Sequence, residues 1–266
     1  MSESASAPPG LPPRSPMLWA FMARQFTSYL RRNMNALRVA RWGELDAPDA
    51  PLVVYSNHPS WWDAALFIVL GKELLPSRAS YAPIDAKMLE KYKFFGRIGA
   101  FGLDLESRRG AVNFLHQASA ILASPERALW ITAQGTFKDV RERPIELRPG
   151  VAHLAERVPD ASFVPLAIDY CFWSERGAEA LVAFGRPIPG RELTALPRNG
   201  RLAVLEQALT DTMNRLAGDA ISRDPARFRP IVEGRQGIGG IYDLWRGARA
   251  RLRGERFQPG HLEQRP

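Results

Sequence analysis

Short apolar runs alternate with segments of helical periodicity through the middle of this chain. A helix that separates two strands favours parallel pairing, because the chain must cross back over the sheet before the next strand begins. The pattern therefore predicts an α/β fold with a mixed, largely parallel central sheet flanked by helices. The predicted strands are 50–57, 78–86, 101–105, 127–133, 161–173 and 179–188, and the predicted helices are 60–74, 87–99, 107–124, 150–158 and 200–222.

The N-terminal region differs from this alternation. Residues 1–16 are rich in proline and serine and predict a disordered tail, without the basic and apolar regions of a signal peptide. Residues 17–42 carry apolar side chains at helical spacing, interrupted by arginines, and predict an amphipathic helix. This helix could pack on the core, or it could lie in a membrane surface with Trp19, Phe21 and Phe26 in the acyl boundary.

Four regions follow from these patterns. We expect the tail at 1–16, an amphipathic membrane-associating helix over 17–45, an α/β domain over 46–222 and a basic extension over 223–266. The extension holds ten arginines against five acidic residues. It fits a solvated tail or a segment that binds a membrane or a partner.

The formal net charge of +8 favours anionic partners. Nucleic acid is not expected, because the basic stretches accompany no helix-turn-helix, zinc-finger or RNA-binding signature. No run approaches the roughly 18 apolar residues of a membrane span. We therefore expect a peripheral protein on the cytoplasmic face of an anionic membrane.

One short stretch, SNHPSWWD at 56–63, concentrates the chemistry of the chain. Ser60 and Asp63 have the spacing of a capping box at the start of a helix. Equally, Asp63 could turn toward His58, fix the imidazole tautomer and leave the other nitrogen free to take a proton. Both interpretations are open from these residues alone.

A partner nucleophile is not evident. The chain has no G-x-S-x-G elbow, and its single cysteine, Cys171, lies in the apolar run IDYCFW. No cluster has metal-ligand spacing and no dinucleotide or Walker loop is present, so we expect neither a metal nor a resident cofactor.

Four blocks in order resemble the lysophospholipid acyltransferase family, which includes the 1-acylglycerol-3-phosphate acyltransferases. NHPSWWD resembles its Asn-His-x4-Asp signature, and GAFGLDLESRRGA at 99–111 resembles its acceptor block. WITAQGTFKDVRERPIELRPGVAHLA at 130–155 resembles its Glu-Gly-Thr block, and FVPLAIDY at 163–170 resembles its Val-Pro strand. The resemblance spans roughly residues 50–190.

The resemblance implies transfer of an acyl chain from acyl-CoA or acyl-carrier protein to a hydroxyl or amine of a lipid acceptor. His58 would act as general base and Asp63 would orient it. The residues implied in substrate binding are Asn57, Arg108, Arg109, Gln134, Gly135, Thr136 and Arg148.

The third block departs from the family pattern at three positions. Gln134 stands for the usual Glu, Ala133 for Pro and Phe137 for Arg. Phe137 cannot form the charge-assisted fork that an arginine gives a phosphate, although Lys138, Arg141 or Arg143 could substitute. The acceptor is therefore open: lysophosphatidate, a phosphate-free lipid, a glycolipid, a carotenoid-type alcohol or an amino-lipid. The alternative is a catalytically impaired lipid-binding protein on the same scaffold.

Overall fold

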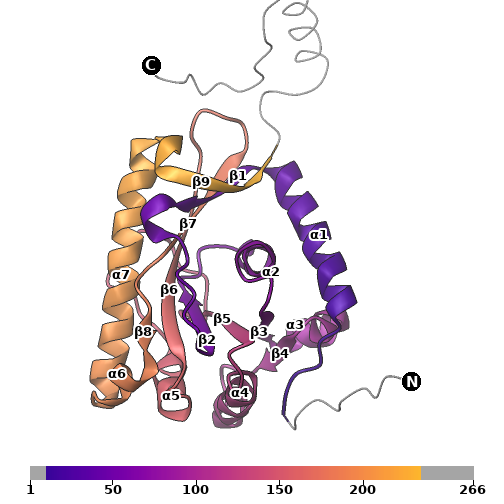
Figure 1. The fold of residues 1–266 in the computed structure, drawn as a ribbon, viewed down its shortest axis with the longest axis vertical. Coiled ribbons are helices and arrows are strands. Elements are labelled where there is room, and N and C mark those ends of the chain that lie inside the picture. The colour runs from indigo at the N-terminus through magenta and orange to yellow at the C-terminus, as the bar shows by residue number, and fades with distance from the viewer. Residues whose placement is uncertain (1–9, 235–266) are drawn as a thin grey trace, which may run out of the picture.

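A computed structural model describes residues 10–234 and shows one mixed sheet between two layers of helices (Figure 1). Within these residues the strand order is β4-β3-β5-β2-β6-β7-β1-β9, with β8 paired to β6. The strands are β1 (Met34–Ala40), β2 (Leu52–Ser56), β3 (Ala79–Asp85), β4 (Ala100–Leu103), β5 (Arg127–Thr132), β6 (Ser162–Cys171), β7 (Ala178–Phe184), β8 (Ile188–Pro189) and β9 (Phe228–Glu233).

The helices between the strands explain the direction of pairing. The pairs β2·β5, β2·β6, β3·β5, β3·β4 and β1·β7 are parallel, whereas β6·β7, β6·β8 and β1·β9 are antiparallel. The predicted mixed, largely parallel sheet is thus confirmed. The helices are α1 (Pro16–Asn33), α2 (Asp63–Leu74), α3 (Ala86–Lys91), α4 (Arg108–Ile121), α5 (Gly150–Arg157), α6 (Gly190–Thr194) and α7 (Arg198–Ser222).

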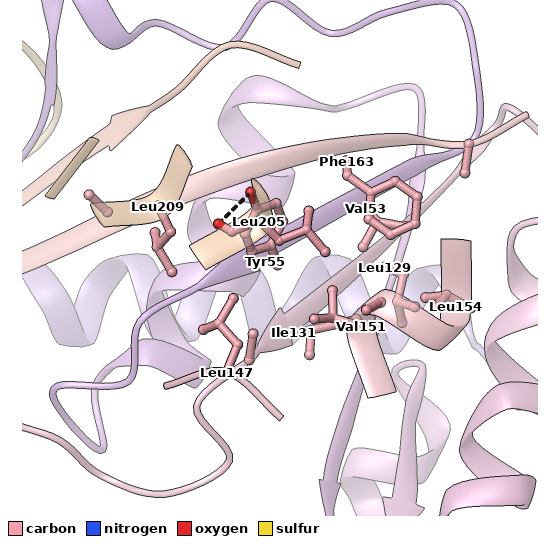
Figure 2. Packing of buried hydrophobic residues seen from close by; sticks show 14 of the residues in the cluster. Val53, Tyr55, Leu129, Ile131, Leu147, Val151, Leu154, Phe163, Leu205 and Leu209 are labelled. Atoms are coloured by element: carbon pink, nitrogen blue, oxygen red, sulfur yellow. Dashed lines mark hydrogen bonds between the residues drawn. The ribbon is translucent and has the colours of Figure 1, made fainter. Parts of the chain in front are cut away.

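Both faces of the sheet are covered. Helices α1 and α2 pack on one face, and α4, α5 and α7 pack on the other, so that α1 and α7 lie on opposite sides in Figure 1. Side chains of a strand alternate between the two faces. Leu52 and Val54 of β2 accordingly join the α1–α2 core, and Val53 and Tyr55 join the α7 core. Figure 2 shows the second core, where the Tyr55 hydroxyl donates to the Leu205 carbonyl of α7.

The predicted helix over 17–42 is correct only as far as Asn33. Residues 34–40 form β1, a fully buried strand between β7 and β9. The helical prediction extended too far because Asn35 and Arg38, three residues apart, fit the polar face of a helix. In the fold both are buried, and both bind the carboxylate of Glu179 on β7.

The limits of the predicted α/β domain are too narrow at both ends. Strand β1 extends it toward the N-terminus, and β9 extends it to Glu233, within the segment assigned to the basic extension. The helix expected at 87–99 is broken into α3 and a 3₁₀ turn, η2 (Lys93–Arg97). The predictions for residues 1–9 of the tail and 235–266 of the extension lie outside the described residues.

Helix α1 packs on the core through one face and exposes the other. Ala23, Thr27 and Leu30 are buried against the core, whereas Met17 and Phe21 are 86% and 56% exposed. Trp19 and Phe26, expected to be free for a membrane, are only partly exposed. No helix among residues 10–234 is both long enough and apolar enough to cross a bilayer.

The buried Arg38–Glu179 ion pair ties β1 to β7, and it gives a test of the fold. The Arg38 Nε lies 2.9 Å from Glu179 Oε2, and both side chains are nearly inaccessible. Replacing Glu179 with Ala leaves a buried guanidinium without its carboxylate, so we expect a loss of about 3–5 kcal/mol in unfolding free energy. Chemical denaturation measures this loss. The exposed Arg191–Asp160 pair is the control, because Asp160→Ala should change stability by less than about 1 kcal/mol.

Candidate active site

The predicted site forms where two neighbouring parallel strands end. Strand β2 ends at Ser56 and β5 at Thr132, and these two residues are paired in register. His58 and Gln134 each follow two residues later, so the topology brings them together across 76 residues of sequence. Ligand sites of open α/β sheets characteristically lie at such carboxyl ends.

The dyad inferred from the sequence is present as a direct contact. His58 Nδ1 lies 2.6 Å from Asp63 Oδ2. The Asp63 side chain is fully buried, and that of His58 is 20% exposed. No described group bonds the other imidazole nitrogen, Nε2. The arrangement is that of an imidazole held at Nδ1, with Nε2 unbonded and the side chain partly exposed.

The helix-cap interpretation is only partly correct, because α2 begins at Asp63 and not at Ser60, and its N-cap residue, Trp62, forms no side-chain cap hydrogen bond. The Ser60 backbone N–H donates to Asp63 Oδ2 at 3.3 Å, and the Ser60 hydroxyl accepts from the Trp62 N–H. One carboxylate therefore closes the turn that precedes α2 and contacts His58. The two functions are compatible because Oδ2 accepts from both partners.

Tyr170 is a site residue that the sequence reasoning missed. Its hydroxyl on β6 donates to Asp63 Oδ1 at 2.8 Å. Burial, together with the adjacent Asp63 carboxylate, raises the pKa of Tyr170 well above its usual value, so the phenol stays protonated and remains a donor. The available signal was its place near the carboxyl end of the strand beside β2.

The segment after β5 holds His58 from the other side. Gln134 Oε1 accepts from the His58 N–H at 2.8 Å, and the Lys138 N–H donates to the His58 carbonyl at 3.0 Å. The ring of Phe137 lies 4.4 Å from the imidazole, centroid to centroid, with the planes tilted by 40°. The residues that replace the family's usual Glu and Arg therefore contact the proposed base directly.

Gly135, Thr136 and Arg148 belong to the same corner. Gly135 has φ +71°, and a Cβ there would lie 2.9 Å from Arg148 Cγ, so glycine is required by both conformation and space. The Arg148 N–H donates to the Ala133 carbonyl, which anchors the arginine beside the turn. The side chains of Thr136 and Arg148 are exposed and available to a ligand.

Three other predicted substrate residues are placed differently. Asn57 is buried, and its amide binds both the carbonyl and the N–H of Ile168, so it joins the loop to β6 and does not face a ligand. Arg108 and Arg109 begin α4, where both are exposed. Neither forms a hydrogen bond or ion pair with another predicted site residue in the described part of the chain.

Cys171 is not a nucleophile of this site. Burial first, and the nearby carboxylates of Asp169 and Glu179 second, raise the pKa of its thiol to about 12, so the reactive thiolate is not formed near neutral pH. Among residues 10–234, no group of side chains has the composition of a metal site.

A groove lies beside the dyad loop, on the α1 side. It has a volume of about 340 Å³ and is lined by Met22, Gln25, Phe26, Ser28, Tyr29, Arg32 and Trp61. Tyr29 also stacks on Trp62, with ring centroids 5.0 Å apart, and this contact fixes α1 against the start of α2. The lining combines apolar side chains with one arginine.

Comparison with known proteins identifies the family. A family model described as Acyltransferase matches residues 23–169, which include the dyad and the segment after β5. Among solved structures, the chain is similar to the 1-acyl-sn-glycerophosphate acyltransferase PlsC from Thermotoga maritima, with 14% identity, a TM-score of 0.45 and coverage of 73% of this chain and 78% of that one. No curated protein matches significantly. The family model spans more than half of the sequence, so the resemblance is confirmed and the chain belongs to the acyltransferase family.

Proposed function

We propose that this acyltransferase moves an acyl chain from acyl-CoA or an acyl-carrier-protein thioester to a hydroxyl or amine of a lipid acceptor, with His58 as general base. The observation that carries the proposal is the contact between His58 Nδ1 and a fully buried Asp63, which leaves Nε2 open. A base held in this way suits deprotonation of a substrate hydroxyl. The reaction would need no covalent acyl-enzyme.

The steps follow from this geometry. Nε2 takes the proton of the acceptor hydroxyl while the oxygen attacks the thioester carbonyl carbon. The C–S bond then breaks, and the imidazolium returns the proton to the departing thiolate. Asp63 stabilises the imidazolium between these two proton transfers, and its bonds from Tyr170 and Ser60 keep its carboxylate in place.

The turn at Gly135 would bind the polar part of a substrate. Its own N–H donates to the Thr132 carbonyl and is therefore used within the turn. The exposed Thr136 hydroxyl and Arg148 guanidinium remain for the ligand, and the guanidinium suits the phosphates of acyl-CoA or of a carrier-protein prosthetic group. The dyad's intact geometry favours an enzyme over a lipid-binding protein that has lost catalysis.

The proposal includes a peripheral position on an anionic membrane, at its cytoplasmic face. Met17, Phe21 and Tyr29 are exposed on α1, and Arg24, Arg31 and Arg32 are exposed on the same helix. Apolar side chains interspersed with arginines suit a helix that lies in the lipid headgroup region. Helix α1 would then bring the dyad loop, which it contacts through Tyr29 and Trp62, close to its lipid acceptor.

Replacing His58 with Ala tests the base. We expect a fall in turnover of about 10²–10⁴-fold, the range typical of a positioned general base. Release of free thiol from acyl-CoA, measured with and without lipid extract, reports the rate. His116→Ala is the matched control, because His116 is exposed on α4 and should leave turnover unchanged. A His58→Ala protein with the normal rate would exclude the mechanism.

Replacing Tyr170 with Phe tests the support of Asp63. The variant removes one hydrogen-bond donor to a buried carboxylate. A hydrogen bond to a charged group contributes about 1.5–3 kcal/mol of stabilisation. We expect kcat to fall by about tenfold or more, with KM for the thioester little changed, because Tyr170 contacts Asp63 and not the thioester. Steady-state kinetics separates the two parameters. An unaltered kcat would show that His58 and Ser60 alone position Asp63.

Replacing Arg24, Arg31 and Arg32 with Gln tests membrane docking through α1. Each basic residue near an anionic surface contributes about 1 kcal/mol, so flotation with phosphatidylglycerol-containing liposomes should fall steeply. Substitution is preferable to truncation through residue 42, which would remove β1 from the sheet.

The control removes the same charge from the other face of the molecule. Arg157, Arg191 and Arg198 lie on α5, α6 and α7, and their replacement by Gln should leave flotation nearly unchanged. Equal losses in the two triple variants would mean that net charge, and not α1, determines binding.

A further inference from the structure

An acceptor that carries a phosphate next to its reacting hydroxyl needs an unpaired cation near His58. A phosphate is held most strongly by a guanidinium with free N–H donors. The segment that contacts His58 continues through residues 137–143 and holds three cations, Lys138, Arg141 and Arg143. The exposed Arg148 lies beside Gly135, so these three are the cations that could supply a second positive charge to an acceptor next to His58.

All three cations are engaged within the protein. Lys138 Nζ lies 3.3 Å from Glu142 Oε2, and Arg141 forms a two-pronged pair with Asp139 at 2.8 and 2.7 Å. This pairing holds the pKa of the Asp139 carboxyl far below its usual range.

Arg143 is bonded to α7 and to its own loop. Its Nε and Nη2 donate to the side-chain oxygen of Asn214 on α7, and its Nη1 donates to the carbonyls of Val140 and Glu142. The loop therefore forms its own network of ion pairs and hydrogen bonds. None of its cations replaces the arginine that Phe137 has displaced.

The two residues that contact His58 are both uncharged. Phe137 lies against the imidazole with its ring 60% exposed, so it presents an apolar surface to whatever approaches the base. Gln134 is buried, and its oxygen is fixed as the acceptor because its partner, the His58 N–H, can only donate. Asp63 contacts the ring at Nδ1 and is fully buried. A phosphate beside His58 would therefore meet the exposed ring of Phe137 and no unpaired cation of residues 137–143.

We infer that this enzyme acylates a lipid hydroxyl whose neighbouring group is uncharged, in preference to one that carries a phosphate. The inference rests on the proposed function, because it concerns the acceptor that His58 deprotonates. Arg148, beside Gly135, then serves the phosphates of the donor. Neutral glycerolipids and neutral glycolipids share the required chemistry, and the experiment distinguishes them.

The test compares acceptors that differ by one phosphate. Purified full-length protein receives one acyl-CoA and either monoacylglycerol, 1-acylglycerol 3-phosphate or a monoacylated glucosyl lipid, each in the same neutral detergent micelles. We expect kcat/KM to be at least tenfold higher for a neutral acceptor than for 1-acylglycerol 3-phosphate. The neutral acceptor with the higher kcat/KM shows whether the enzyme prefers a glycerolipid or a glycolipid. Equal rates, or a preference for the phosphate, would overturn the inference while leaving the acyltransferase function intact. Transfer to no acceptor would overturn the proposed function and, with it, this inference.

A positive charge introduced at residue 137 tests whether Phe137 causes the preference for a neutral acceptor. Phe137→Arg supplies a guanidinium next to His58, so the ratio of kcat/KM for phosphate over neutral acceptor should rise at least tenfold. Phe172→Arg is the matched control, since Phe172 is another exposed aromatic residue and does not stack on His58. It should leave the ratio unchanged. A similar rise in both variants would show that overall charge, and not this position, selects the acceptor.

The role of Arg148 gives a second, independent readout. Arg148→Gln should raise KM for acyl-CoA severalfold and leave KM for the neutral acceptor unchanged, because the guanidinium serves the donor. A change confined to the acceptor KM would place an acceptor anion at Arg148 and contradict the inference.

Discussion

The burial of one carboxylate organises the site. Transfer of an anion from water to a protein interior is unfavourable unless hydrogen-bond donors replace its hydration. Asp63 obtains such donors from His58, Ser60 and Tyr170, which belong to the loop after β2, the entry to α2 and the strand β6. These segments must therefore hold one relative arrangement for the fold to be stable. The same requirement keeps the imidazole oriented, so stability and catalytic geometry depend on the same bonds.

Local sequence patterns predicted the parts of this arrangement that depend on neighbouring residues. The alternation of strands and helices predicted the sheet and its mainly parallel pairing, and SNHPSWWD predicted the contact between His58 and Asp63. Long-range contacts explain what was missed. Asn35 and Arg38 look exposed in sequence because their partner, Glu179, is more than 140 residues away. Tyr170 could be recognised as a site residue only once β6 was known to lie beside β2.

The net positive charge of the chain does not imply a positively charged site. A net charge of +8 indicates a general attraction to anions, yet the loop closest to His58 uses its cations in internal pairs. Exposed arginines without partners occur instead on α1, at the start of α4 and at Arg148. Attraction to a surface and selection of an acceptor can therefore be separated in space, since a surface responds to summed charge and a pocket responds to the few groups that line it.

The position of β1 in the sheet has a consequence for how the polypeptide is made. Synthesis proceeds from the N-terminus, and β1 pairs with β7 and β9, which begin at Ala178 and Phe228. A wholly buried strand thus emerges from the ribosome long before either neighbour exists, next to a helix with exposed apolar residues. Such segments are prone to aggregate while they wait. A chaperone that covers β1 during this interval would protect the nascent chain until β7 and β9 have been made.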